Sequence, residues 1–247
     1  MLGTIMHKAL EVLYTPYLNK PMLPEHLDAM KSEVQSEVLK AFRSKFPDEE
    51  SDTGRNHLAR KVATRFISQY IEQEKDRIIS QRADKTENTV IGLEQTLKFT
   101  SQVEGTSVTY VGNADRIDQM GNVIRIIDYK TGLVEDKDVE ISGTHEFTES
   151  DENGKAFQLM MYAWLYLKSQ NEQAVVQPGL ISFRRNDKRF MKLEIPELRV
   201  LNAASIREFE SVLTDITKEI LSPETTFDQT ISVKRCGNCE FNAICRR

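Results

Sequence analysis

The sequence lacks any apolar run long enough to cross a bilayer, and it lacks the charged start and apolar centre of a signal peptide. It also lacks a basic excess, because 33 Lys and Arg face 38 Asp and Glu for a net charge of −5. Nucleic-acid binders usually present a basic face, so this balance is a weak argument against that class. Net charge does not show how charges are distributed, however. These absences predict a cytoplasmic, globular chain without a membrane partner.

Cysteine is scarce: the 247 residues include three, and all of them lie near the C-terminal end, at Cys236, Cys239 and Cys245. An odd number clustered in this way does not suit a disulfide framework. The C-x2-C-x5-C spacing places two thiolates within one turn and a third nearby, as in zinc and iron–sulfur sites. We expect the thiols to bind a cluster or a metal, with zinc held by three cysteines and one histidine, or three free thiols, as the alternatives.

Helical periodicity dominates the first 87 residues, in which apolar residues recur every three or four positions. This pattern predicts three amphipathic helices, over residues 3–18, 24–46 and 57–79, with a polar loop over 47–56. The period changes near residue 88 to the alternation of strands. Three strands are expected, over residues 88–100, 107–120 and 122–131, with Gly121 supplying the positive φ of the last turn.

The second half of the chain begins with residues 132–155, which have no clear period and are expected to form a mobile loop. Further elements are expected in the order helix, strand, strand, helix, over residues 155–170, 177–185, 189–196 and 202–221. This order predicts an α/β or α+β fold, with a crossover helix and an N-terminal helical layer on the sheet. We divide it into a helical part (1–87), a core (88–230) and a cysteine-rich tail (231–247).

Two carboxylates and an ammonium gather on the predicted hairpin. Asp128 and Lys130 point to the same face of one strand, because strand residues two apart share a face. Pairing about the turn at Met120-Gly121 sets Asp115 opposite Asp128 or one pair away. Opposed carboxylates destabilise a sheet, and a hard divalent cation such as Mg²⁺ or Mn²⁺ removes that repulsion. A solvated patch of surface charges is the alternative.

Five motifs occur in one order along the chain. They are "GTIMHKALE" with His7, Gly112-x-x-Asp115-Arg116-Ile117-Asp118, Ile127-Asp128-Tyr129-Lys130-Thr131-Gly132, "QLMMY" with Gln158 and Tyr162, and "CGNCEFNAIC". Together they resemble the PD-(D/E)XK nuclease superfamily, and specifically its RecB/AddB-like branch with a C-terminal iron–sulfur cysteine cluster. The resemblance spans almost the whole chain and implies a restriction-endonuclease-like mixed sheet flanked by helices.

The resemblance implies a metal site for Mg²⁺ or Mn²⁺. Asp115 and Asp128 would bind the ions, and His7 and the backbone carbonyl of Tyr129 would complete the coordination sphere. Glu94, in the first strand, matches an acidic position at the edge of such sites. The alternative for His7 is a helix-surface residue, and for Glu94 an exposed strand residue.

The resemblance also implies catalytic roles. Lys130 would polarise the attacking water or stabilise charge in the transition state. Gln158 and Tyr162, four residues apart on one helix face, would steady this lysine or the DNA backbone. Packing of both side chains in the core is the alternative.

The function implied is a Mg²⁺-dependent DNA exonuclease domain of a helicase–nuclease in DNA repair, with DNA and a helicase subunit or domain as partners. The resemblance implies a [4Fe–4S] cluster on these cysteines in the full-length protein, because similar iron–sulfur nucleases carry the fourth cysteine upstream of the His motif. The helical pattern starts at once and predicts an excised piece of a longer polypeptide, so we expect the cluster to be absent or incomplete in this chain. A stand-alone exonuclease of the CRISPR-adaptation type and a catalytically silent DNA-binding or scaffold module are the alternatives.

Overall fold

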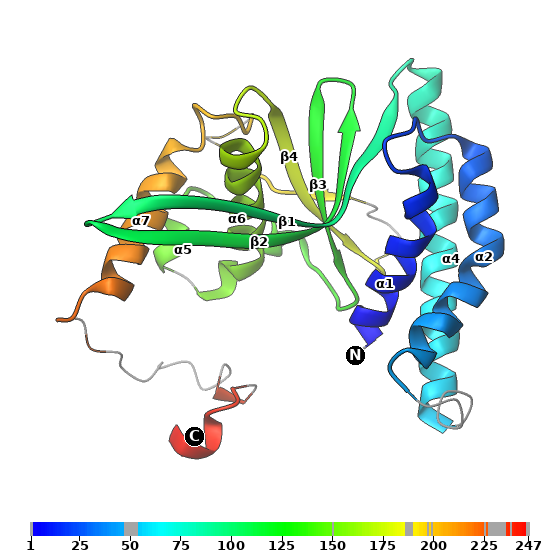
Figure 1. Cartoon of the computed structure of the whole chain (residues 1–247), viewed down its shortest axis with the longest axis horizontal. Helices are drawn as coiled ribbons and strands as arrows, with labels where there is room; N and C mark the ends of the chain where they lie inside the picture. The colour runs from blue at the N-terminus through cyan, green and yellow to red at the C-terminus, as the bar shows by residue number, and fades with distance from the viewer. Residues whose placement is uncertain are drawn as a thin grey trace.

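The centre of the fold is a mixed five-stranded sheet in the order β1-β2-β3-β4-β5 (Figure 1). The strands are β1 Asn88–Val103, β2 Thr106–Met120, β3 Val123–Lys130, β4 Val175–Ser182 and β5 Met191–Lys192. Strands β3 and β4 are parallel and the other neighbours are antiparallel. The computed structural model describes residues 2–46, 54–149, 151–185, 190–196, 198, 200–224, 226, 236–237 and 239–245. The predicted restriction-endonuclease-like mixed sheet flanked by helices is confirmed.

Three helices cover one face of the sheet as an N-terminal layer: α1 Leu2–Tyr14, α2 Pro24–Arg43 and α4 Gly54–Ala83. A short 3-10 turn, Thr15–Tyr17, follows α1. The apolar stripes of the helices form one core with the side chains of β3 and β4 that point to them, such as Ile127 and Ile181. The three predicted helices are confirmed. The predicted polar loop was wrong over residues 54–56, which are the first turn of α4, and its residues 47–53 lie outside the described part of the chain.

The opposite face of the sheet carries α6 Gly154–Ser169 and α7 Arg207–Leu221. Helix α6 is the predicted crossover between the parallel strands β3 and β4. Trp164 of α6 is the centre of this second core, with edge-on ring contacts to Phe99 of β1 and Tyr110 of β2 at centroid distances of 5.3 and 5.0 Å. Helix α7 starts five residues later than expected, because residues 203–206 form turns.

The segment between β3 and α6 is ordered, so the predicted mobile loop was wrong. It forms three short helical turns, η2 Asp136–Asp138, α5 Glu146–Glu149 and η3 Asp151–Asn153. Four of its apolar side chains are buried in the core around Trp164, namely Val134, Val139, Ile141 and Phe147. Their irregular spacing carries no period, and this is why the pattern of the sequence did not reveal the packing.

The strands after α6 are shorter than expected. Strand β4 ends at Ser182, and β5 has two residues, Met191 and Lys192, which pair with β4. The predicted turn at Asn186-Asp187 lies outside the described residues, as does the boundary at residues 230/231. The boundary at 87/88 stays a prediction. None of the helices in the described part of the chain is both long and apolar enough to span a membrane.

Candidate active site

The ladder between β1 and β2 is interrupted where Glu94 faces Asp115. The pairs on either side of this position are Leu93 with Arg116 and Gln95 with Ala114. Glu94 has φ +44°, in the left-handed region that residues with side chains rarely adopt. The register also shifts between Val90 and Gly92. Irregularities of this kind redirect side chains in sheets and are frequent beside active sites.

At this interruption, Asp115 and the residue after it both face the helical layer. Neighbouring side chains of a regular strand point to opposite faces. Here Asp115 and Arg116 both contact α1: the Asp115 carboxylate lies beside His7, and the Arg116 guanidinium lies 4.3 Å from the centroid of the Tyr14 ring. Two consecutive polar side chains thus share one side of the sheet.

His7 gathers the acidic groups. Its Nδ1 lies 3.3 Å from Asp115 Oδ1 and 3.9 Å from Glu94 Oε1. Its Nε2 lies 3.0 Å from the Tyr129 carbonyl oxygen. One ligand atom of each of His7, Glu94 and Asp115 lies within 4.8 Å of those of the other two. The structure therefore brings together His7, Glu94, Asp115 and the Tyr129 carbonyl, which the sequence assigned to one metal site.

Electrostatics at this group favour a cation. Burial lowers the pKa of His7, but a hydrogen bond to Asp115 and the charges of Asp115 and Glu94 outweigh burial and raise it. Burial, followed by the charge of Asp115, raises the pKa of Glu94. Both shifts show that negative charges lie close together at this site and repel one another. A divalent ion between the carboxylates would relieve this repulsion.

Asp128 lies beside Asp115 across the hairpin, as predicted. The last pair of β2 with β3 is Arg116 with Ile127, so Asp115 and Asp128 occupy the next position. In place of a ladder bond, Asp115 Oδ2 accepts a hydrogen bond of 2.6 Å from the Tyr129 N–H. Asp128 is outside the group around His7. Its buried Oδ2 lies 2.8 Å from Lys130 Nζ, but it accepts no hydrogen bond of good geometry.

Lys130 is fixed between two elements. Its Nζ pairs with Asp128 and donates a hydrogen bond of 3.0 Å to Gln158 Oε1. Gln158 in turn donates from Nε2 to the Tyr162 hydroxyl at 2.7 Å, one turn further along α6. Burial, followed by the charge of Asp128, raises the pKa of Tyr162, so its hydroxyl stays neutral. The helix motif therefore contacts Lys130 directly, and its role of steadying this lysine stays a prediction.

Gly112 allows α6 to approach β2 this closely. A Cβ at this position would lie 2.9 Å from Leu165 Cδ1 and 3.0 Å from two ring carbons of Tyr162. We expect Gly112→Ala to displace the Tyr162 ring, loosen the contact of Gln158 with Lys130, and destabilise the fold by about 1–3 kcal/mol through overpacking. Urea unfolding and nuclease assays measure the two effects. Gln35→Ala, on the exposed side of α2, is the control, and unchanged stability and activity in Gly112→Ala would contradict the prediction.

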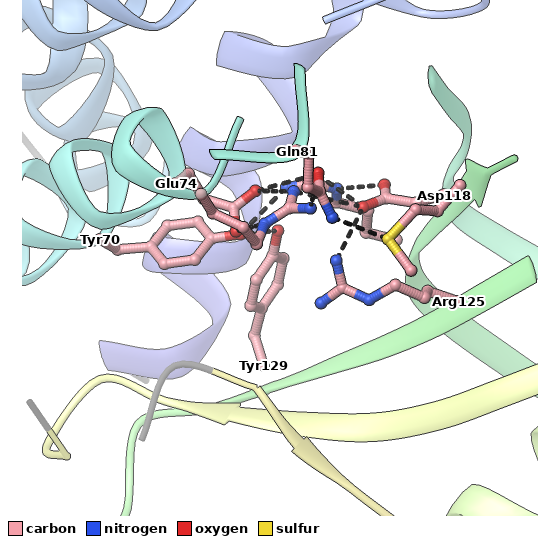
Figure 2. Close-up of polar contacts among 9 residues, drawn as sticks. Tyr70, Glu74, Gln81, Asp118, Arg125 and Tyr129 are labelled. Atoms are coloured by element: carbon pink, nitrogen blue, oxygen red, sulfur yellow. Dashed lines mark hydrogen bonds and ion pairs between the residues drawn. The ribbon is translucent and has the colours of Figure 1, made fainter. Parts of the chain in front are cut away.

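A buried ionic network lies directly behind the candidate site (Figure 2). Arg116, fully buried, donates from Nε to Asp118 Oδ1 at 2.5 Å and from NH2 to Asp118 Oδ2 at 2.8 Å. It also donates to the Tyr70 hydroxyl at 3.0 Å and to Glu74 Oε2 at 3.2 Å, both on α4. Burial raises the pKa of Glu74, but the charges of Arg77 and Arg116 outweigh it and hold the pKa well below its usual range. Glu74 is therefore ionised.

Tyr129 joins the network to the candidate site. Its hydroxyl lies 3.3 Å from that of Tyr70, as Figure 2 shows, whereas its backbone contacts His7 and Asp115 on the other side. Sequence reasoning missed Tyr70 and Glu74. The available signal was Arg116 with Asp118 in an apolar strand, because a buried guanidinium requires partners.

Comparison with known proteins adds the family. The profile of the PD-(D/E)XK nuclease superfamily matches residues 1–246. The chain belongs to this superfamily. A solved protein titled "Crystal structure of SSO0001" is 16% identical and covers 99% of this chain and 84% of its own, with a TM-score of 0.34. None of the curated proteins compared matches.

PD-(D/E)XK nucleases use divalent metals, and the side chains present here fit such an ion. Two carboxylates, an imidazole and a carbonyl oxygen form a hard donor set that suits Mg²⁺ or Mn²⁺. The buried Oδ2 of Asp128, which faces Lys130 but accepts no hydrogen bond of good geometry, would be a further oxygen ligand. The Tyr129 carbonyl has a second lone pair beside the one directed at His7, so it remains able to bind an ion.

The cysteines of this PD-(D/E)XK chain do not form a ready cluster site. Cys236 is buried and Cys239 is exposed, and all three thiols are free of disulfides. The Cys239 N–H donates to the Cys236 carbonyl at 3.1 Å, and Cys245 ends the short helix α9, Asn242–Cys245. Within the described residues, the three thiols are not gathered to metal-ligand distances as His7, Glu94 and Asp115 are. The iron–sulfur cluster and the RecB/AddB-like branch stay predictions.

Proposed function

We propose that this metal-dependent nuclease is a DNA exonuclease that hydrolyses phosphodiester bonds with Mg²⁺ or Mn²⁺. The observation that supports this is the position of Asp115 and Asp128 on neighbouring strands, one beside His7 and Glu94 and the other beside Lys130. Two carboxylates with a fixed ammonium are what phosphodiester hydrolysis requires: ligands for the ion and a positive charge at the reacting phosphate.

In the proposed mechanism, His7, Glu94, Asp115, Asp128 and the Tyr129 carbonyl would hold the ion. A divalent cation bound there would lower the pKa of water and neutralise phosphate charge. The hydrogen bond from His7 to the Tyr129 carbonyl fixes the ring so that its Nδ1 faces the carboxylates.

The lysine acts on the reacting phosphate in this mechanism. Lys130, paired with Asp128, would orient the attacking water and stabilise the negative charge that develops on phosphate oxygens. Gln158 and Tyr162 keep its ammonium in place, which limits the reorganisation needed at the moment of reaction.

The proposal also covers the larger protein and the cellular process in which this domain acts. The order of motifs supports an exonuclease domain of a cytoplasmic helicase–nuclease in DNA repair, with a helicase subunit or domain as partner and a [4Fe–4S] cluster completed by a ligand from elsewhere. No catalytic step is assigned to that cluster. A stand-alone exonuclease of the CRISPR-adaptation type would use the same residues. A silent DNA-binding module is less well supported, because Asp115, Asp128 and Lys130 are all present with their partners.

The experiment that tests this compares linear DNA with covalently closed circular DNA of the same sequence in the presence of Mg²⁺. We expect the linear molecule to be degraded from its ends and the circle to survive, and a chelator to stop the reaction. Cleavage of both at the same rate would replace the exonuclease by an endonuclease. The absence of cleavage with either Mg²⁺ or Mn²⁺ would support the silent DNA-binding module.

A further inference from the structure

The β1–β2 hairpin continues well beyond its neighbour in the sheet. Strand β3 pairs with β2 from Arg116 to Met120, whereas the pairs of β1 with β2 run on to Val103 and Thr106. Residues 95–103 and 106–114 therefore form a two-stranded ribbon, which reaches toward α7 in Figure 1. One of its faces packs on α6 and α7, and there the Tyr110 hydroxyl lies 2.8 Å from Thr217 Oγ1.

The other face of the ribbon is open to solvent, and we call it the outer ribbon face. It consists of four cross-strand pairs of exposed residues: Thr96 with Asn113, Lys98 with Val111, Thr100 with Thr109, and Gln102 with Ser107. Side-chain hydrogen bonds of 2.9 Å join the first and the third pair. These side chains offer hydroxyls, amides and one ammonium, with no carboxylate between Glu94 and Glu104.

Threonine is common on exposed strands because of its β propensity, so composition alone does not make this face a binding surface. Its position does. The outer ribbon face begins at the interrupted pair of Glu94 and Asp115, one step before Thr96 and Asn113 along each strand face. The ribbon runs from this pair away from the helical layer (Figure 1), so it offers a surface along which a polymer bound in the candidate active site can continue.

We propose that the outer ribbon face binds the sugar–phosphate backbone of one substrate strand and leads it to the active site. Ser, Thr, Asn, Gln and Lys are the side chains that contact phosphate oxygens without reading sequence. From Glu94 to Gln102 the ribbon spans roughly 27 Å at the rise of a strand, which matches about eight nucleotides at the B-form spacing. This inference rests on the proposed function and adds to it a sequence-independent track.

The test uses Lys98→Glu, with Lys45→Glu at the far end of α2 as the charge-matched control, since both lysines are exposed. Single-stranded oligonucleotides of about two and about twelve nucleotides are cleaved in Mg²⁺, so that the longer one alone reaches Lys98 and the ribbon beyond it. We expect Lys98→Glu to raise KM for the longer oligonucleotide on the order of tenfold, with kcat and the short oligonucleotide unaffected. The slope of log affinity against log salt should fall by about one.

Two outcomes would overturn the proposed track. The first is that the KM of Lys98→Glu depends on oligonucleotide length in the same way as the KM of the wild-type protein. The second is an equal rise of KM in Lys45→Glu. Thr109→Glu provides a second variant on the same face, with the same expected result. Fluorescence anisotropy with the longer oligonucleotide separates this inference from the proposed function, because it requires no cleavage. If no nucleic acid is cleaved but Lys98→Glu still weakens binding, the track stands and the exonuclease assignment fails.

Discussion

Asp128→Asn is expected to lower the rate of DNA cleavage by about 10³-fold or more, with the fold unchanged. The substitution keeps the size of the side chain but removes the charge that pairs with Lys130 at 2.8 Å and that, in the proposed mechanism, helps to hold a divalent ion beside Asp115. The loss therefore combines weaker metal binding with a displaced lysine. Release of nucleotides from linear DNA in Mg²⁺ measures the rate, and calorimetric titration with Mn²⁺ measures metal binding directly.

The burial of Asp128 adds an expectation about stability. Burial, followed by the charge of Asp115, raises the pKa of Asp128 against the pull of Lys130, so the ionised form is costly without a cation. Removal of its charge should therefore leave thermal stability equal or higher. Asp84→Asn, an exposed aspartate beyond the end of α4, is the matched control and should cleave normally. Activity of Asp128→Asn within tenfold of wild type would remove Asp128 from the proposed site.

Arg116→Met is expected to destabilise the protein by about 3–5 kcal/mol, the cost of an uncompensated buried charge. The guanidinium is fully buried and satisfies Asp118, Tyr70 and Glu74 at once. Methionine has a similar length but no donor, so two carboxylates lose a partner in the interior. Urea unfolding followed by circular dichroism measures the free energy of unfolding.

Lys218→Met is the control for this prediction. It removes an exposed ion pair of 3.7 Å with Asp215 on α7 and should change the free energy of unfolding by less than about 1 kcal/mol. In the double variant Arg116→Met with Asp118→Leu, part of the lost stability should return, because one of the stranded charges has been removed as well. Equal effects of Arg116→Met and Lys218→Met would show that the network contributes no more than a surface pair.

The hairpin and its two aspartates could be predicted from the sequence because local rules determine them. The alternation of two strands and a positive φ at Gly121 set the register, and the register sets Asp115 beside Asp128. The rule of regular alternation failed at Glu94, because the interrupted ladder between β1 and β2 changes the face of the sheet to which side chains point. Regular alternation alone would have separated Asp115 from Arg116, and both in fact contact α1.

Contacts between segments that are far apart in the chain could not be predicted from the sequence, for a different reason. Arg116 and Asp118 stand out as a charged pair in an apolar strand, but nothing in the helical stripe of α4 distinguishes Glu74 as the further partner of Arg116, 42 residues away. Likewise, the buried side chains of residues 132–155 follow the shape of the core surface and not a helical or strand period. Tertiary packing alone defines these positions.

The contact of Gln158 with Lys130 has a consequence for the order in which the protein becomes active. The acidic groups lie between residues 94 and 128, but the lysine beside them is held by a helix that comes later in the chain. Chains are made from the N-terminus, and the earlier segments emerge first. In the proposed mechanism, a nascent chain thus brings its acidic groups together while Lys130 still lacks its support, and hydrolytic competence would follow only with α6. The position of that helix in the sequence would delay a potentially harmful activity until β1, β2 and β3 have been made.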